Sequence, residues 1–185
     1  MRSVLLSLLA ALAWLGVFSP PQTTATPKAD QLDKPNFSGN WRLDLKASTS
    51  LEPLMTQIGA SFVERKYADT VTLRATLNQT ETNLTLAVRG PAFDLDETLY
   101  LDGRTAPGSL KLLGATAVKT TTTWSKDQKQ LVATYQIKTK QGKDGQLTIK
   151  RYLTDGGQTL VATYNLKLKT EPNQTAARQI WRKQV

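Results

Sequence analysis

Short segments in which apolar and polar residues alternate fill most of the chain, and they limit its fold more than any other feature. The alternation recurs from residue 71 onward, with turn signals such as Asp102-Gly103 and Gly156-Gly157 between segments. With an earlier segment over 37–45, the pattern predicts about ten strands at the spacing typical of a sandwich or barrel. Because long antiparallel strands without covering helices must lose their edges, we expect a mainly β fold, a single closed antiparallel barrel. In the second half, strands are expected near 109–113, 115–124, 130–139, 146–154, 158–169 and 174–183.

One segment has a different period. Apolar residues between positions 51 and 62 recur at the three-and-four spacing of one helix face, with Ser50 as a cap. Gly59 divides this segment into two short helices, and Asp69 ends it. We expect these helices to form a lid whose apolar face either packs on the barrel mouth or lines an entrance. Met55 and Phe62 are therefore candidate ligand contacts.

The N-terminal end predicts export. Arg2 precedes an apolar run over 4–17, which is too short for the roughly 20 residues that span a bilayer and fits a signal peptide. We expect a signal peptide at 1–25, a linker at 26–35 and one domain at 36–185. The mature protein would then be periplasmic or extracellular.

Histidine and cysteine are absent from the 185 residues. The chain therefore cannot build Ser-His or Cys-His catalysis, a disulfide, or a metal site that needs imidazole or thiolate. No carboxylate pair suggests acid–base chemistry, so we expect no catalytic residue, metal or cofactor, and a protein that is not an enzyme.

The net charge of +9 comes from dispersed basic residues. Exposed aromatics are not interleaved with them, which argues against nucleic acid as a partner. The charge is compatible with a weak contact to an anionic membrane surface. The oligomeric state is not encoded in any pattern.

The start of the domain carries a resemblance. Phe37-Ser38-Gly39-Asn40-Trp41-Arg42-Leu43, followed by the helical segment with its Gly59 and its Arg65-Lys66 pair, resembles the fatty-acid-binding proteins of the lipocalin-like (calycin) superfamily. The resemblance implies a ten-stranded barrel with a helical lid that holds a small hydrophobic ligand. In that barrel Trp41 has a structural role, because a buried tryptophan can close one barrel end.

Strand parity nominates ligand residues. Arg151 shares a face with Leu147 and Ile149, so it is expected to point inward, where its guanidinium suits a carboxylate. Tyr135 and Tyr164 lie on apolar faces of nearby strands and could share the headgroup. Arg178 shares a face with Ile180 and is a second inward candidate.

Two alternatives stay open. Glu97 also lies on an apolar face, so Arg151 is either a ligand anchor or half of an internal ion pair. In the fatty-acid-binding proteins an Arg-x-Tyr pair on the last strand holds the carboxylate, whereas here Arg178 and Trp181 lie on opposite faces. The sequence predicts an exported binding protein for a small hydrophobic, anionic ligand such as a fatty acid or lipid. The alternative is an interaction or envelope-stress protein whose filled barrel is only a scaffold.

Overall fold

One antiparallel sheet of ten strands and two α-helices make up the described part of the chain. The computed structural model describes residues 34–91, 93–110 and 116–184. The predicted signal peptide and most of the predicted linker lie outside these residues. The helices are α1 (Glu52–Ile58) and α2 (Phe62–Thr70), and the strands are β1 (Gly39–Leu43), β2 (Arg74–Gln79), β3 (Asn83–Gly90), β4 (Phe93–Tyr100), β5 (Thr105–Ala106), β6 (Thr116–Trp124), β7 (Leu131–Lys138), β8 (Asp144–Thr154), β9 (Thr159–Leu168) and β10 (Gln174–Gln184).

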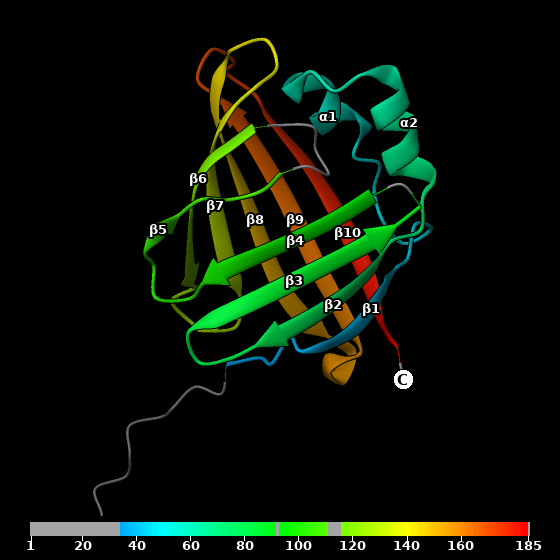
Figure 1. Cartoon of the computed structure of the whole chain (residues 1–185), viewed down its shortest axis with the longest axis vertical. Coiled ribbons are helices and arrows are strands. Elements are labelled where there is room, and N and C mark those ends of the chain that lie inside the picture. Colours follow the sequence, from blue (N-terminus) through cyan, green and yellow to red (C-terminus); the bar gives the residue numbers. More distant parts are fainter. Residues whose placement is uncertain (1–33, 92, 111–115, 185) are drawn as a thin grey trace, which may run out of the picture. The chain divides into compact units, whose positions relative to one another are not determined.

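The sheet rolls into a nearly closed barrel (Figure 1). Strands that are neighbours in sequence pair with each other, except β4 and β5, and β1 connects the two halves of the sheet by pairing with both β2 and β10. Trp41, for example, lies opposite Ala75 on one side and Lys183 on the other. The order is β4-β3-β2-β1-β10-β9-β8-β7-β6-β5, which leaves β4 and β5 as the outermost strands of the described sheet. The predicted mainly β barrel of about ten strands is confirmed.

The segment that follows β5 lies against the inner side of the barrel. The Ser109 backbone N–H donates to Glu97 of β4 at 3.0 Å, and Leu110 is buried. A Cβ added at Gly108 would lie 3.0 Å from the ring of Tyr135, so this backbone packs directly on β7. The short strand β5 at Thr105–Ala106 was not predicted, whereas within the predicted strand near 109–113 Leu110 forms a β-bridge and residues 111–113 lie outside the described part.

The helical lid forms as two helices divided at Gly59, as the sequence indicates. Gly59 ends α1 in the left-handed conformation, with φ at +89°, and Ser61 begins α2 with a capping box to Glu64. Met55 and Ile58 are fully buried, but Phe62 is 62 % exposed. The turn at Gly59 reorients the chain, so the apolar period of the first helix does not continue into the second.

The lid is fastened to the turn between β7 and β8. The Lys140 backbone N–H donates to the Ile58 carbonyl at 3.0 Å, and the Lys140 ammonium contacts the Glu64 carboxylate at 2.8 Å. Lys140 and the Ser61 backbone hold the pKa of Glu64 at about 2, well below its ordinary value. No helix in the described part of the chain is long and apolar enough to cross a membrane.

The first strand has an architectural role. Trp41 is completely buried, and its indole Nε1 donates to the Phe37 carbonyl at 3.1 Å. Gly39 has φ at +141°, and a Cβ there would lie 3.0 Å from Lys183 Cε. Glycine is needed at this position because an L side chain would strain the backbone and crowd β10.

Candidate ligand-binding site

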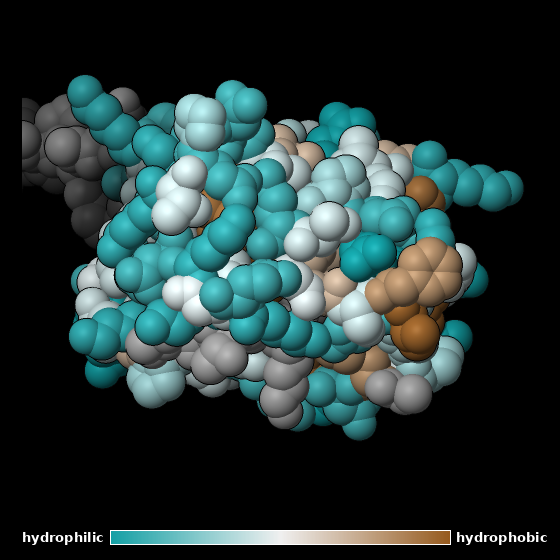
Figure 2. All heavy atoms as spheres, turned by 90° about the horizontal axis from the view of Figure 1, so that it is seen from above, coloured by the Kyte–Doolittle hydropathy of each residue, from teal (hydrophilic) through white to brown (hydrophobic). Residues whose placement is uncertain are grey.

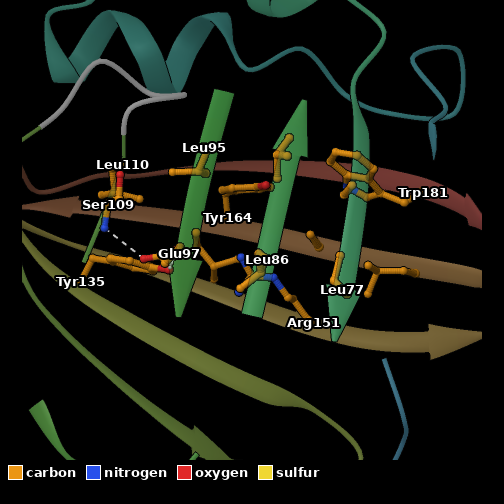
Figure 3. A pocket seen from close by; sticks show the side chains of 15 residues that line it. Leu77, Leu86, Leu95, Glu97, Ser109, Leu110, Tyr135, Arg151, Tyr164 and Trp181 are labelled. Carbon is orange, nitrogen blue, oxygen red and sulfur yellow. Dashed lines mark hydrogen bonds between the residues drawn. The ribbon is translucent and has the colours of Figure 1, made fainter. Parts of the chain in front are cut away.

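A small cavity lies inside the barrel (Figure 3). Its volume is about 60 Å³, several times the roughly 10–15 Å³ that one water molecule requires. Apolar side chains from β2, β3, β4, β8 and β9 form most of its wall, together with Trp181 of β10. Its polar lining consists of five residues: Glu97, Ser109, Tyr135, Arg151 and Tyr164.

Glu97 is held by two hydrogen bonds. Its Oε1 accepts the Ser109 backbone N–H at 3.0 Å, and its Oε2 accepts the Tyr135 hydroxyl at 3.1 Å. Burial raises the pKa of Glu97 above its ordinary value, and the Ser109 N–H, the charge of Arg151 and the Tyr135 hydroxyl offset part of that rise. In the part of the chain that the structure describes, no three His, Cys, Asp or Glu side chains are grouped to hold a metal ion.

Arg151 projects from β8 into the same cavity, as strand parity predicts. The residue is 7 % exposed, and its Nη1 is buried without a hydrogen-bond partner among the described residues. No ion pair joins it to Glu97 within the described structure, although its charge does lower the pKa of that carboxyl. The sequence left Arg151 as either a ligand anchor or half of an internal ion pair. The direct ion pair with Glu97 is not present among the described residues.

Both tyrosines named from the sequence line the cavity. Tyr135 is fully buried, and Tyr164 donates its hydroxyl to the Gln179 side-chain oxygen at 2.7 Å. Burial raises the pKa of both phenols, so both are neutral hydrogen-bonding groups. The lining therefore combines one cation and one carboxyl group with two neutral hydroxyls.

The expectation that Arg178 points inward is wrong. Arg178 is exposed, and the inward side chains of β10 are Gln179 and Trp181. Ile180 misleads the parity argument because it is buried on the outer side of the strand, at 6 % exposure. The segment after β1 continues beside the backbone of β10, since the Asp44 N–H donates to the Ile180 carbonyl at 2.8 Å.

The two lid candidates lie outside the cavity lining. Met55 is buried in the hydrophobic core, and Phe62 is on the surface beside Val63, which is 74 % exposed. Phe62 and Val63 are the exposed large hydrophobic residues of the described chain. Figure 2 shows hydrophobic atoms gathered at one side of an otherwise hydrophilic face.

Sequence reasoning missed two lining residues, Ser109 and Trp181, and also Gln179, which accepts the hydroxyl of the lining residue Tyr164. Ser109 contributes a backbone N–H, which no side-chain pattern reveals. Gln179 and Trp181 alternate with Arg178 and Ile180, so their shared face was visible, but Gln179 made it look like the polar side. The signal that could have identified Gln179 and Trp181 is the alternation Ala177-x-Gln179-x-Trp181, which begins opposite Tyr164 of β9.

Comparison with solved structures identifies the fold. A fatty acid binding protein of Schistosoma mansoni in complex with arachidonic acid superposes with a TM-score of 0.61 at 17% identity, covering 80% of this chain and 96% of that one. Apo Caenorhabditis elegans lipid binding protein 8 gives 0.59 at 13% identity, covering 80% and 95%. Human cRBP IV gives 0.59 at 16% identity, covering 81% and 99%. No family model and no curated protein matches the sequence.

The described residues thus form a nearly closed ten-stranded barrel with a helical lid. This is the fold of the fatty-acid-binding proteins, as the first strand and the lid suggested.

Proposed function

We propose that this protein is an exported, non-enzymatic binding protein for a small hydrophobic ligand with an anionic or strongly polar head. The observation that carries the proposal is the Arg151 guanidinium, buried in an apolar cavity with its Nη1 unpartnered among the described residues. An unpaired buried charge costs several kcal/mol, and a carboxylate on the ligand would offset that cost with charge-assisted hydrogen bonds.

The hydrophobic part of the ligand follows from the rest of the lining. Leucine, valine and isoleucine side chains form most of the wall, and each buried methylene contributes about 0.8 kcal/mol. The proteins of similar fold are named as a fatty acid binding protein, a fatty acid transporter and a lipid binding protein, which supports a lipid-like ligand. Export rests on the apolar run over 4–17.

The volume of the cavity supports a second candidate. Pockets that hold drug-sized ligands measure roughly 300–1,000 Å³, whereas this cavity offers about 60 Å³. A long acyl chain therefore requires lining side chains to move apart. A barrel that stays filled would instead act as a scaffold for another interaction.

A binding assay with matched arginine variants tests the proposal. A fluorescent fatty-acid analogue should bind the lipid-stripped protein saturably, and Arg151→Gln should weaken binding by about tenfold or more, because hydrogen bonds to charged groups contribute about 1.5–3 kcal/mol. Arg178→Gln is the control, since it removes the same charge from the outer face. Absence of saturable binding, together with no lipid in native mass spectra of protein from its own host, would refute the carrier function and leave the scaffold.

A further inference from the structure

Four arginines form a row across the outer face of the barrel. Arg42 of β1 lies opposite Arg182 of β10 and opposite Arg74 of β2, and Arg74 lies opposite Arg89 of β3. All four side chains are exposed. Adjacent strands are about 4.8 Å apart, so three intervals place the four Cα atoms of this row across about 14 Å. Strands β2 and β3 of this row lie side by side at the front of Figure 1.

The two ends of the row are neutralised by the protein itself. Arg182 contacts Asp44 at 3.1 Å, and Arg89 contacts Asp96 at 2.6 Å. The carboxylate of Asp96 raises the pKa of Arg89, as expected for a close pair. These end residues therefore have their charge balanced without any ligand.

The two central arginines are different. Neither Arg42 nor Arg74 has an ion-pair partner among the described residues, although they face each other across β1 and β2. Like charges directly opposite on a sheet destabilise it. Both side chains also border a shallow hollow on this face, whose lining is Arg42, Thr72, Arg74, Arg89, Gly90 and Pro91.

We propose that this arginine hollow binds a phosphate group. A phosphate carries at least three acceptor oxygens and can bridge Arg42 and Arg74, and guanidinium groups match it through paired N–H donors. The described lining contains no aromatic side chain, so no base can stack there, which argues against single-stranded nucleic acid. The phosphate belongs either to a soluble phosphate compound or to a phospholipid headgroup.

This site is separate from the cavity inside the barrel. Arg74 lies on the outer face of β2, whereas its neighbour Ala75 points inward and lines the cavity. Occupation of the arginine hollow therefore does not require a ligand inside. The inference stands or fails independently of the proposed function.

The test compares two double variants of the full chain. Arg42→Gln with Arg74→Gln removes the two unpaired central charges. Lys138→Gln with Lys167→Gln is the matched control, because it removes two exposed cations from β7 and β9. Binding is followed by NMR of arginine side-chain N–H signals during titration with inorganic phosphate at constant ionic strength. A second arm measures cosedimentation with phosphatidylcholine vesicles with and without phosphatidic acid.

We expect saturable binding in at least one arm, weakened about tenfold or more by the arginine variant and unchanged by the lysine control. Binding to free phosphate identifies a soluble source, and binding only to phosphatidic acid vesicles identifies a headgroup. The arginine variant should also raise Tm in phosphate-free buffer, since it relieves the like-charge contact. Linear, unsaturable shifts with no vesicle binding, or equal losses in both double variants, would overturn the proposal.

Discussion

Replacement of Arg151 by methionine should make the protein more stable while it weakens ligand binding. Methionine keeps the apolar part of the arginine side chain, although it is shorter, and removes the buried charge. Replacing a buried ion pair by well-packed apolar residues is often neutral or stabilising by about 1–4 kcal/mol, whereas removing one partner of a formed buried pair costs about 3–5 kcal/mol. Arg151 has an unpartnered Nη1 and no ion pair within the described residues.

The change in the free energy of unfolding on Arg151→Met depends on Glu97 as well. Arg151 lowers the pKa of that buried carboxyl, so its removal takes away a favourable charge interaction. Glu97 can respond by binding a proton, which limits the loss. We therefore expect Arg151→Met to gain about 1–2 kcal/mol in free energy of unfolding, the lower part of the range for such substitutions.

Urea unfolding and thermal scans of ligand-free protein measure this gain. For a protein of this size, each kcal/mol shifts Tm by roughly 2–4 °C, so the rise should be about 2–8 °C. Arg178→Met on the outer face is the control, and an exposed substitution there should stay within about 0.5 kcal/mol of wild type. If Arg151→Met instead loses about 3 kcal/mol or more while the control is neutral, Arg151 is a structural ion-pair partner and the ligand-anchor reasoning is refuted.

Three further changes probe the lid, the cavity and the first strand. The protection factors of the α2 amides, which correct hydrogen exchange for its intrinsic pH dependence, should fall as pH drops below about 4.5. Because the pKa of Glu64 is lowered to about 2, its contribution to stability is present above the unfolded value and is lost as pH falls towards 2. Lys140→Gln should remove most of that pH dependence. Glu97→Gln should flatten the pH profile of the free energy of unfolding, measured by urea titration. Because the pKa of Glu97 is raised in the folded protein, the wild type should lose stability relative to the variant as pH rises above about 4.5. Gly39→Ala should lower the free energy of unfolding by about 1–3 kcal/mol, through strain at φ +141°.

Each of these has a result that would contradict it. Protection factors in α2 that do not change with pH would show that the Lys140–Glu64 contact does not hold the lid. Parallel pH profiles for wild type and Glu97→Gln would show that the carboxyl titrates normally in the folded protein. A neutral Gly39→Ala would mean that β1 can shift to accept a side chain.

The barrel itself was predictable because its cause is local. Alternation with period two marks each strand, and turn residues mark the joints, so the strand count and the antiparallel, nearly closed sheet could be predicted from the sequence. Parity on β8 also placed Arg151 on the cavity face, and it placed Tyr135 and Tyr164 beside it. The residues that flank these three on their strands are exposed or half-buried, so burial and inward orientation coincide there.

Parity failed where an outward residue is buried. Ile180 is buried although Gln179 and Trp181 are the inward residues of β10, so an apolar residue there does not mark the inside of the barrel. The partner of Glu97 could not be predicted either, because a backbone N–H from Ser109 and a hydroxyl from Tyr135 compete with Arg151 for its oxygens. Such choices depend on tertiary distances that no single-strand pattern contains.

The inner face of β10 determines how the cavity balances charge. Its inward residues Gln179 and Trp181 are neutral, and Gln179 already accepts the Tyr164 hydroxyl, so this strand supplies no second cation. Arg151 and Glu97 are the cation and the carboxyl group of the described lining. Under the proposed function, an anionic head beside Arg151 would repel an ionised Glu97 and raise its pKa further. An anionic ligand therefore favours the protonated form of Glu97, whereas a neutral polar head is compatible with the ionised form.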